Sequence, residues 1–274
     1  MTLRNPRARA APAGFTLIEL MVALVISMLL IIAVSSTYLS QRMSYNTQGD
    51  IADIQANARA IAQLLMRDGR LAGYSDFTAD KTFDGVNIVD GTNDLGVNTS
   101  DTLTFRYYGA SKPGMTESAS GVKADGTAVD CAGNVVDSFT MTTEIYSIVN
   151  DASGVPWLQC AVNGNPGTLL FRGVERFQIL FGEDIDGNQS VDRYTRPGVA
   201  NPGNVVAIVA SLVLRGNSTT NPNPSSATLN HFGKGYAPAD TAPAGDAGSV
   251  AVLPADGRLR KHFTFYIAVR NRLN

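Results

Sequence analysis

Residues 15–34 form a nearly unbroken apolar run, and Glu19 is the only charged residue in it. As a helix rising about 1.5 Å per residue, the run would span roughly 30 Å, which matches the hydrocarbon core of a bilayer. Arg4, Arg7 and Arg9 precede the run without any acidic residue among them. We therefore expect a single membrane crossing that leaves the N-terminus in the cytoplasm and the remainder of the chain outside it.

The position of Glu19 helps to distinguish three ways in which this segment could be processed. A conventional signal peptide would be cut after the apolar run, where Ser35 and Ser36 offer small residues, and a plain anchor would stay uncut. Both alternatives leave a carboxylate inside a membrane helix, at a cost of about 3 kcal/mol. A cut between Gly14 and Phe15 would instead place a new amino group one helical turn from Glu19. An ion pair within the chain or with a neighbouring chain then becomes available, and the helix N-terminus favours the negative charge.

The sequence Gly14-Phe15-Thr16-Leu17-Ile18-Glu19 resembles, at all six positions, the processing motif of type IV pilins and type II secretion pseudopilins. The resemblance implies that a prepilin peptidase cuts after Gly14 and methylates the new N-terminal Phe15. It also implies that Glu19 contacts the N-terminus of a neighbouring subunit during assembly. We expect a pilin-like fold of the α+β class, with a long N-terminal helix, transmembrane in its first half, packed on an antiparallel β-sheet domain, because strand-like runs follow one long helix without βαβ alternation.

Composition supports an extracytoplasmic domain. Without the three leader arginines, 19 basic residues face 24 acidic ones, a net charge of −5, so no nucleic acid is expected as a partner. The only two cysteines are Cys131 and Cys160. In an oxidising periplasm we expect them to form a disulfide worth about 3 kcal/mol, with two free thiols as the alternative.

The helix is expected to continue beyond the membrane, from about Phe15 to Arg70, because apolar residues recur at spacings of three and four. These residues are Ile51, Ile54, Ala58, Ile61 and Leu65. Breaks are conceivable near Ser35–Ser36 and at Gly49, and Gly69 and Gly73 are candidate terminators. The expected organisation is a cleaved leader at 1–14, a transmembrane and assembly helix at 15–40, and a periplasmic half of the helix at 41–74.

A β-rich globular domain is expected over residues 75–274. Residues 75–100 are predicted to be a loop, and 216–257 a mobile insertion rich in Gly, Pro, Asn and Ser. Alternating or strongly apolar runs predict strands at 102–108, 138–148, 157–162, 168–171, 174–181, 205–214 and 262–269.

One cluster has the pattern of a metal site, but nothing indicates catalysis. The chain has two histidines, His231 and His262, and none of the common catalytic or nucleotide-binding motifs, so we do not expect an enzyme. Oxygen-bearing side chains alternate around Gly187 as in the start of a calcium loop, with Thr195 where such a loop has a glutamate. The candidate Ca²⁺ ligands are Asp184, Asp186, Asn188 and Asp192. A polar β-turn is the alternative.

Four further stretches resemble the PilW-type minor pilins: Leu65–Tyr74, Gly173–Asn188, Val205–Arg215 and Leu259–Arg272. Gly69 departs from that pattern, which more often has a bulkier residue there. The resemblance implies a minor pilin that primes type IV pilus assembly in the bacterial inner membrane and then lies at the pilus tip. The implied partners are other minor pilins, the major pilin, a PilY-type tip adhesin and the prepilin peptidase. The alternatives are a GspJ-like pseudopilin of type II secretion and a surface-binding tip module.

Overall fold

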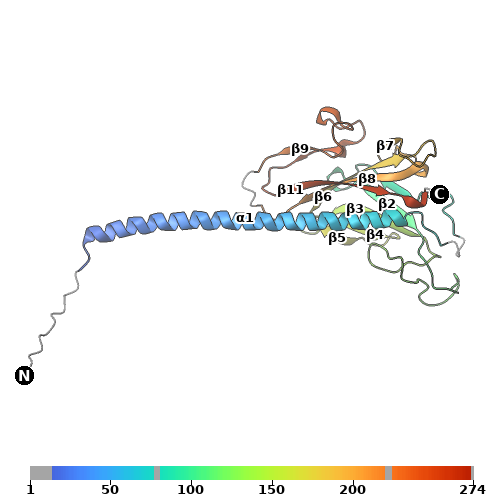
Figure 1. The fold of residues 1–274 in the computed structure, drawn as a ribbon, viewed down its shortest axis with the longest axis horizontal. Coiled ribbons are helices and arrows are strands. Elements are labelled where there is room, and N and C mark those ends of the chain that lie inside the picture. The colour runs from blue at the N-terminus through green and yellow to red at the C-terminus, as the bar shows by residue number, and fades with distance from the viewer. Residues whose placement is uncertain (1–13, 77–80, 220–223, 273–274) are drawn as a thin grey trace, which may run out of the picture. The chain divides into compact units, whose positions relative to one another are not determined.

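A computed structural model describes residues 14–76, 81–219 and 224–272 of the chain (Figure 1). The chain divides into two compact units, Met1–Asn46 and Thr47–Asn274. One helix, α1 (Leu17–Leu71), contributes its first part to one unit and its last part to the other.

In the described part of the first unit, residues 14–46, α1 begins at Leu17 and nearly all of its large apolar side chains are exposed. No break occurs near Ser35–Ser36, because α1 is continuous there. The hydroxyl of Ser36 donates to the carbonyl of Ala33 at 2.9 Å, and that of Ser27 donates to Ala23 at 2.7 Å. These polar groups are therefore satisfied inside the helix, as an apolar surrounding requires.

The described residues of the second unit form three antiparallel sheets. A five-stranded sheet has the order β1-β2-β3-β4-β5, and a four-stranded sheet has the order β11-β8-β6-β7. A two-stranded sheet pairs β10 with β9. The strands are β1 (Val89–Thr92), β2 (Thr102–Tyr107), β3 (Thr142–Asn150), β4 (Pro156–Val162), β5 (Thr168–Arg172), β6 (Val174–Glu183), β7 (Arg193–Thr195), β8 (Val205–Arg215), β9 (Ala227–Asn230), β10 (Val250–Leu253) and β11 (Arg260–Ala268). Short 3-10 helices, η2 to η6, lie at 97–99, 202–204, 238–240, 247–249 and 270–272.

The apolar stripe of the second half of α1 is buried in the core of this unit. Ile54, Ala58, Ile61 and Leu65 pack in one cluster with residues of both larger sheets, such as Phe105 and Leu212. Their spacing places them on one helix face, which the sheets cover. The predicted α+β class, with a long helix followed by antiparallel sheets, is confirmed.

The end of α1 is fixed by its contact with the C-terminal segment. The helix ends at Leu71 and Gly73 follows with a positive φ of 75°, as expected of a terminator. The side-chain amide of Asn271 donates to the carbonyls of Arg70 and Ala72 at 3.0 Å, so it satisfies groups that the helix end leaves open. Gly69 is not a terminator, because it lies inside the helix and is buried.

Some strands were not expected from the sequence. The predicted loop at 75–100 contains β1, the predicted insertion at 216–257 contains the β9–β10 pair, and β7 follows the polar turn at 184–192. β1 has the sequence Val-Asp-Gly-Thr, which is typical of a turn, and it becomes a strand only by pairing with β2. The insertion lies between β8 and β11 in the sequence. Three of its polar residues, His231, Asp246 and Ser249, are buried. Its mobility stays a prediction.

Candidate functional site

The processing motif lies at the start of α1. Gly14, Phe15 and Thr16 precede the first helical residue and are exposed, with the Phe15 side chain 84% exposed. The backbone N–H of Glu19 donates to Oγ1 of Thr16 at 3.3 Å. Thr16 is thus the N-cap residue of α1, and its side-chain oxygen satisfies an open N–H of the first turn, that of Glu19 at N3. The peptide bond between Gly14 and Phe15 therefore lies in accessible, non-helical chain.

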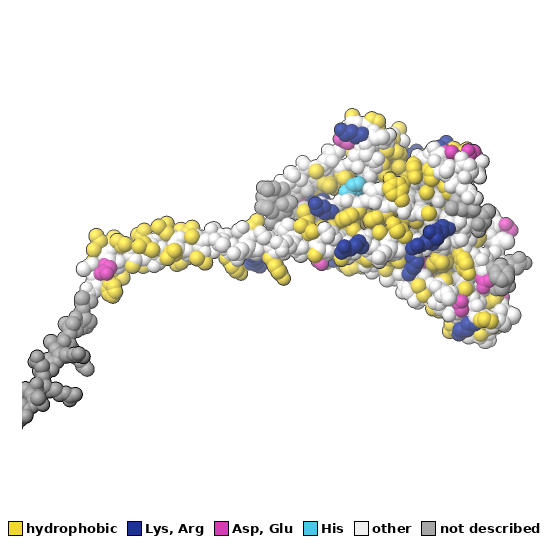
Figure 2. Space-filling model, in the orientation of Figure 1, with side chains coloured by type: hydrophobic (Ala, Val, Ile, Leu, Met, Phe, Trp, Pro, Cys, Tyr) yellow, Lys and Arg dark blue, Asp and Glu magenta, His cyan; other side chains and the backbone are white. Residues whose placement is uncertain are grey.

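Directly after this motif, α1 presents a continuous apolar surface. The described residues contain one helix that is long and apolar enough to cross a membrane, and none of its most apolar window is buried. Figure 2 shows hydrophobic side chains covering this part of the helix. Such a surface requires lipid or other apolar helices as its surroundings.

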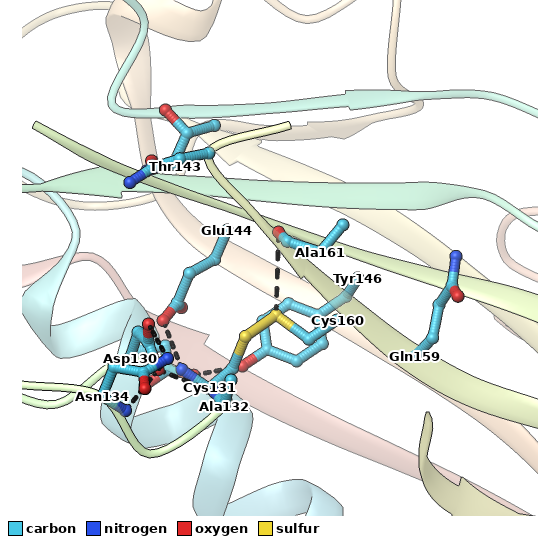
Figure 3. Close-up of a disulfide and its surroundings, with 12 residues drawn as sticks. Asp130, Cys131, Ala132, Asn134, Thr143, Glu144, Tyr146, Gln159, Cys160 and Ala161 are labelled. Carbon is cyan, nitrogen blue, oxygen red and sulfur yellow. Dashed lines mark hydrogen bonds between the residues drawn. A yellow bond between two sulfur atoms is a disulfide. The ribbon is translucent and has the colours of Figure 1, made fainter. Parts of the chain in front are cut away.

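Cys131 and Cys160 are joined by a disulfide (Figure 3). Their Cα atoms are 6.3 Å apart, and 29 positions separate them in the sequence. Cys160 lies on β4, whereas Cys131 lies in the long connection between β2 and β3. The bridge therefore fixes that connection, which contains no helix or named strand of its own, to the five-stranded sheet.

A buried polar network adjoins the disulfide. The backbone N–H of Cys131 and the hydroxyl of Tyr107 both donate to Oε1 of Glu144 at 2.7 Å. The hydroxyl of Tyr146 donates to Oδ2 of Asp68 on α1, and Nε of Arg67 donates to Oδ1 of the same carboxylate at 2.6 Å. Asp68 and Glu144 are both fully buried. The network thus connects the helix, the five-stranded sheet and the disulfide loop.

Burial shifts the titration of these groups. Desolvation raises the pKa of Glu144 to about 8, and the nearby charge of Asp68 adds to the shift. The pKa of Asp68 is also raised, chiefly by burial, although Arg67 and Tyr146 counteract the shift by hydrogen bonding. Oε2 of Glu144 is buried and has no hydrogen-bond partner among the described residues. A proton on Glu144 at neutral pH is consistent with this environment.

Sequence reasoning missed this network, although one signal was present. The apolar stripe of α1 runs through Ile61 and Leu65, and its next position at a spacing of three is Asp68. A carboxylate on a core-facing position requires a buried partner. That partner, Tyr146, is 78 positions away and could not be identified from spacing.

The candidate calcium ligands are only partly brought together. Carboxylate oxygens of Asp184, Asp186 and Asp192 lie within 4.8 Å of one another. Both oxygens of Asp184 accept backbone N–H groups of the same turn, from Gly187 at 2.8 Å and Gln189 at 2.9 Å. These local bonds are those of the polar-turn alternative.

The fourth candidate ligand, Asn188, already accepts a hydrogen bond within the turn. Oδ1 of Asn188 accepts the backbone N–H of Ser190 at 2.8 Å. Thr195 bonds to Glu183 at 2.8 Å. Calcium binding at this turn therefore stays a prediction.

Two family models match this chain, one at its N-terminus and one over its β-rich part. The prokaryotic N-terminal methylation motif matches residues 9–35, which include Gly14, Phe15 and Glu19. The family described as Type IV Pilus-assembly protein W matches residues 145–271, from β3 to the segment that caps α1. The chain belongs to the PilW family of type IV pilus-assembly proteins. As a PilW-family protein it is a structural component and not an enzyme.

Two further comparisons add little to this assignment. No curated protein matches the chain. Among solved structures, it is similar to the type IV-like pilin TTHA1219 from Thermus thermophilus, with 14% identity and a TM-score of 0.44. The similarity covers 80% of this chain and 96% of that pilin.

Some residues of the sites described above lie within the PilW match, and others lie outside it. It includes Cys160, Tyr146 and the aspartates of the 184–192 turn, whereas Asp68, Cys131 and Glu144 lie outside both matched regions. The polar network of this PilW-family protein therefore joins the matched part of the fold to the helix and the β2–β3 connection.

Proposed function

We propose that the chain is cut between Gly14 and Phe15, is methylated at Phe15, and then helps to prime type IV pilus assembly at the pilus tip. The exposed apolar surface of α1, which begins directly after the processing motif, carries this proposal. Lipid covers such a surface before assembly, and the apolar helices of neighbouring subunits cover it afterwards.

Glu19 gives the helix a docking position. Its place in the first turn of α1 is favourable electrostatically, because the helix N-terminus carries partial positive charge. The amino group of a cleaved neighbouring chain supplies a full positive charge, and in apolar surroundings such a pair is far stronger than in water. Glu19 thus favours one axial position of a subunit against its neighbour.

The proposed organisation follows the processing. Residues 1–14 form the leader, of which 1–13 lie outside the described residues, and 15–40 form the transmembrane and assembly helix. Residues 41–74 form the periplasmic half of the helix, and 75–274 form the β-rich domain. The protein first lies in the inner membrane with a cytoplasmic N-terminus, and it then enters the extracellular pilus.

The proposed partners are the prepilin peptidase, the other minor pilins, the major pilin and a PilY-type tip adhesin. Membership of a pilus-assembly family supports pilus subunits as neighbours, rather than the pseudopilins of a secretion system. The acidic balance of the chain after cleavage supports a protein partner rather than a nucleic acid.

Deletion of the gene tests this role. We expect far fewer surface pili in the deletion strain, counted by electron microscopy, and restoration by the wild-type gene. Glu19→Ala should be cleaved normally but fail to enter pili, whereas Glu117→Ala, which removes an exposed carboxylate, should restore piliation. Unchanged piliation together with lost protein secretion would reject the pilus role. Normal incorporation of Glu19→Ala would reject the docking function of Glu19.

A further inference from the structure

A cavity lies on the four-stranded sheet, on the face opposite α1. It has a volume of about 660 Å³, within the range of small-molecule sites. Ile267 on β11 faces α1, so Tyr266 points to the other side. Tyr266 lies opposite Val209 on β8, which lies opposite Leu180 on β6. These three side chains form the floor of the cavity.

The loop after β9 and the edge strand β7 form the walls. His231, Phe232 and Tyr236 come from the loop, and Tyr194 comes from β7. The Phe232 and Tyr236 rings are in edge-to-face contact, with centroids 5.3 Å apart. Figure 2 shows histidine at the surface among hydrophobic side chains in this unit. The cavity therefore offers several aromatic rings, of which Tyr266 is the most open, with 68% exposure.

Among the residues that the structure describes, no charged side chain lines this cavity. Asn230, His262 and Thr264 add polar groups to the lining, together with two glycines of the loop. Burial lowers the pKa of His231 to about 3, and it also lowers the pKa of His262, so both imidazoles are neutral at physiological pH. The polar groups of the lining are therefore uncharged hydroxyl, imidazole and amide groups.

A buried hydrogen-bond relay lies beneath the cavity. Oγ of Ser211 is 2.7 Å from Nδ1 of His231 and 2.7 Å from Nε2 of His262. Because a hydroxyl has one proton, at most one imidazole accepts from Ser211, and at least one donates to it. Nε2 of His231 and Oδ1 of Asn230 are buried without a hydrogen-bond partner among the described residues. Such atoms are rare in folded proteins, and they indicate unmet hydrogen-bonding capacity at this wall.

We propose that this cavity binds a neutral carbohydrate. The C–H face of a sugar ring packs against an aromatic ring, while its hydroxyl groups both donate and accept, which suits the mixed polar lining. A charged ligand would lose its hydration without a counter-charge, and a purely aliphatic one would leave the polar groups unpaired. No residue given for the lining of this cavity belongs to α1, so the inference does not depend on the proposed function.

The test uses the full chain in lauryldimethylamine oxide, a detergent without a sugar headgroup that could compete. The probes are maltose, lactose and the N-acetylglucosamine disaccharide chitobiose, with N-acetyl-phenylalaninamide as an aromatic probe that is not a sugar. Binding is followed by saturation-transfer NMR up to about 10 mM, a range that detects weak, millimolar sites. Chitobiose distinguishes amino-sugar polymers of cell walls from the plain hexose glycans that the other two disaccharides represent.

We expect saturable binding of at least one disaccharide, weakened about tenfold or more by Tyr266→Ala. Tyr45→Ala, which removes a comparably exposed tyrosine from α1, should leave the affinity unchanged. If Tyr266→Ala also lowers the melting temperature, Tyr194→Ala in the β7 wall replaces it. The absence of sugar binding, or equal binding by the pocket variants and the wild type, would overturn the proposal. Binding of the aromatic probe alone would also overturn it.

Discussion

At the scale of single residues, Gly69 controls how closely the C-terminal strand approaches the helix. A Cβ atom at this position would overlap Cγ2 of Ile267, and both residues are buried. The residue that departs from the expected family pattern is thus required by packing. The branched side chain of Ile267 cannot move aside easily, because its χ1 angle is restricted.

Gly69→Ala should therefore lower the free energy of unfolding by about 1–2 kcal/mol, because overpacking outweighs the better helix propensity of alanine. A Cβ atom added at Gly49 in the same helix would meet no atom within 4 Å apart from its chain neighbours and the adjacent helix backbone, so Gly49→Ala should stabilise by about 0.5–1 kcal/mol. Urea unfolding measures both changes. The cost of Gly69→Ala should shrink in an Ile267→Ala background, and an equal cost there would contradict the assigned contact.

Glu144 should make stability depend on pH. Its carboxyl has a pKa of about 8 in the folded chain and about 4.5 without the fold, so the folded chain binds one more proton between these values. The free energy of unfolding should therefore fall as pH rises through this window, by up to about 1.4 kcal/mol per pH unit from this group.

Glu144→Gln removes this proton but keeps an oxygen that can accept from Tyr107 and Cys131. Its melting temperature should depend less on pH between about 5 and 8 than that of the wild type. Glu117→Gln, at an exposed carboxylate, serves as the control and should keep the wild-type dependence. Parallel curves for Glu144→Gln and the wild type would show that Glu144 does not hold a proton in the folded chain.

At the scale of elements, the disulfide compensates for the missing regular structure of the β2–β3 connection. Replacing Cys131 and Cys160 together by alanine should lower the free energy of unfolding by about 3 kcal/mol, the loop entropy of a closure of this length. The midpoint of urea unfolding measures this change, and reduction of the wild type should reproduce it. An unchanged midpoint would mean that the polar network around Glu144 holds the loop without the bridge.

Elements with a strong hydrophobic pattern were predictable, whereas those defined by distant partners were not. The stripe from Ile54 to Leu65 predicted the helix, and the apolar runs of β6 and β8 predicted the centre of the four-stranded sheet. β1 and β9 have only four residues each and no strong apolar pattern, and they become strands because a neighbouring strand pairs with them. The processing motif is contiguous and could be read directly. The Ser211 relay joins residues 20 and 51 positions apart, so no local spacing reveals it.

At the scale of the whole molecule, the chain combines an apolar helix that needs a covering with a β-rich unit that has its own core. In the proposed function, lipid covers the apolar helix only until the helix enters a fibre, where neighbouring subunits cover it. In that proposal, the move from lipid to fibre depends on a new N-terminus at Phe15, one helical turn from Glu19.

The central claim is tested most directly by mass spectrometry of the protein recovered from sheared surface pili. We predict an N-terminal peptide that begins with N-methylated Phe15 and lacks residues 1–14. An intact Met1, a cut after the apolar run near Ser35–Ser36, or the absence of the protein from purified pili would contradict the account.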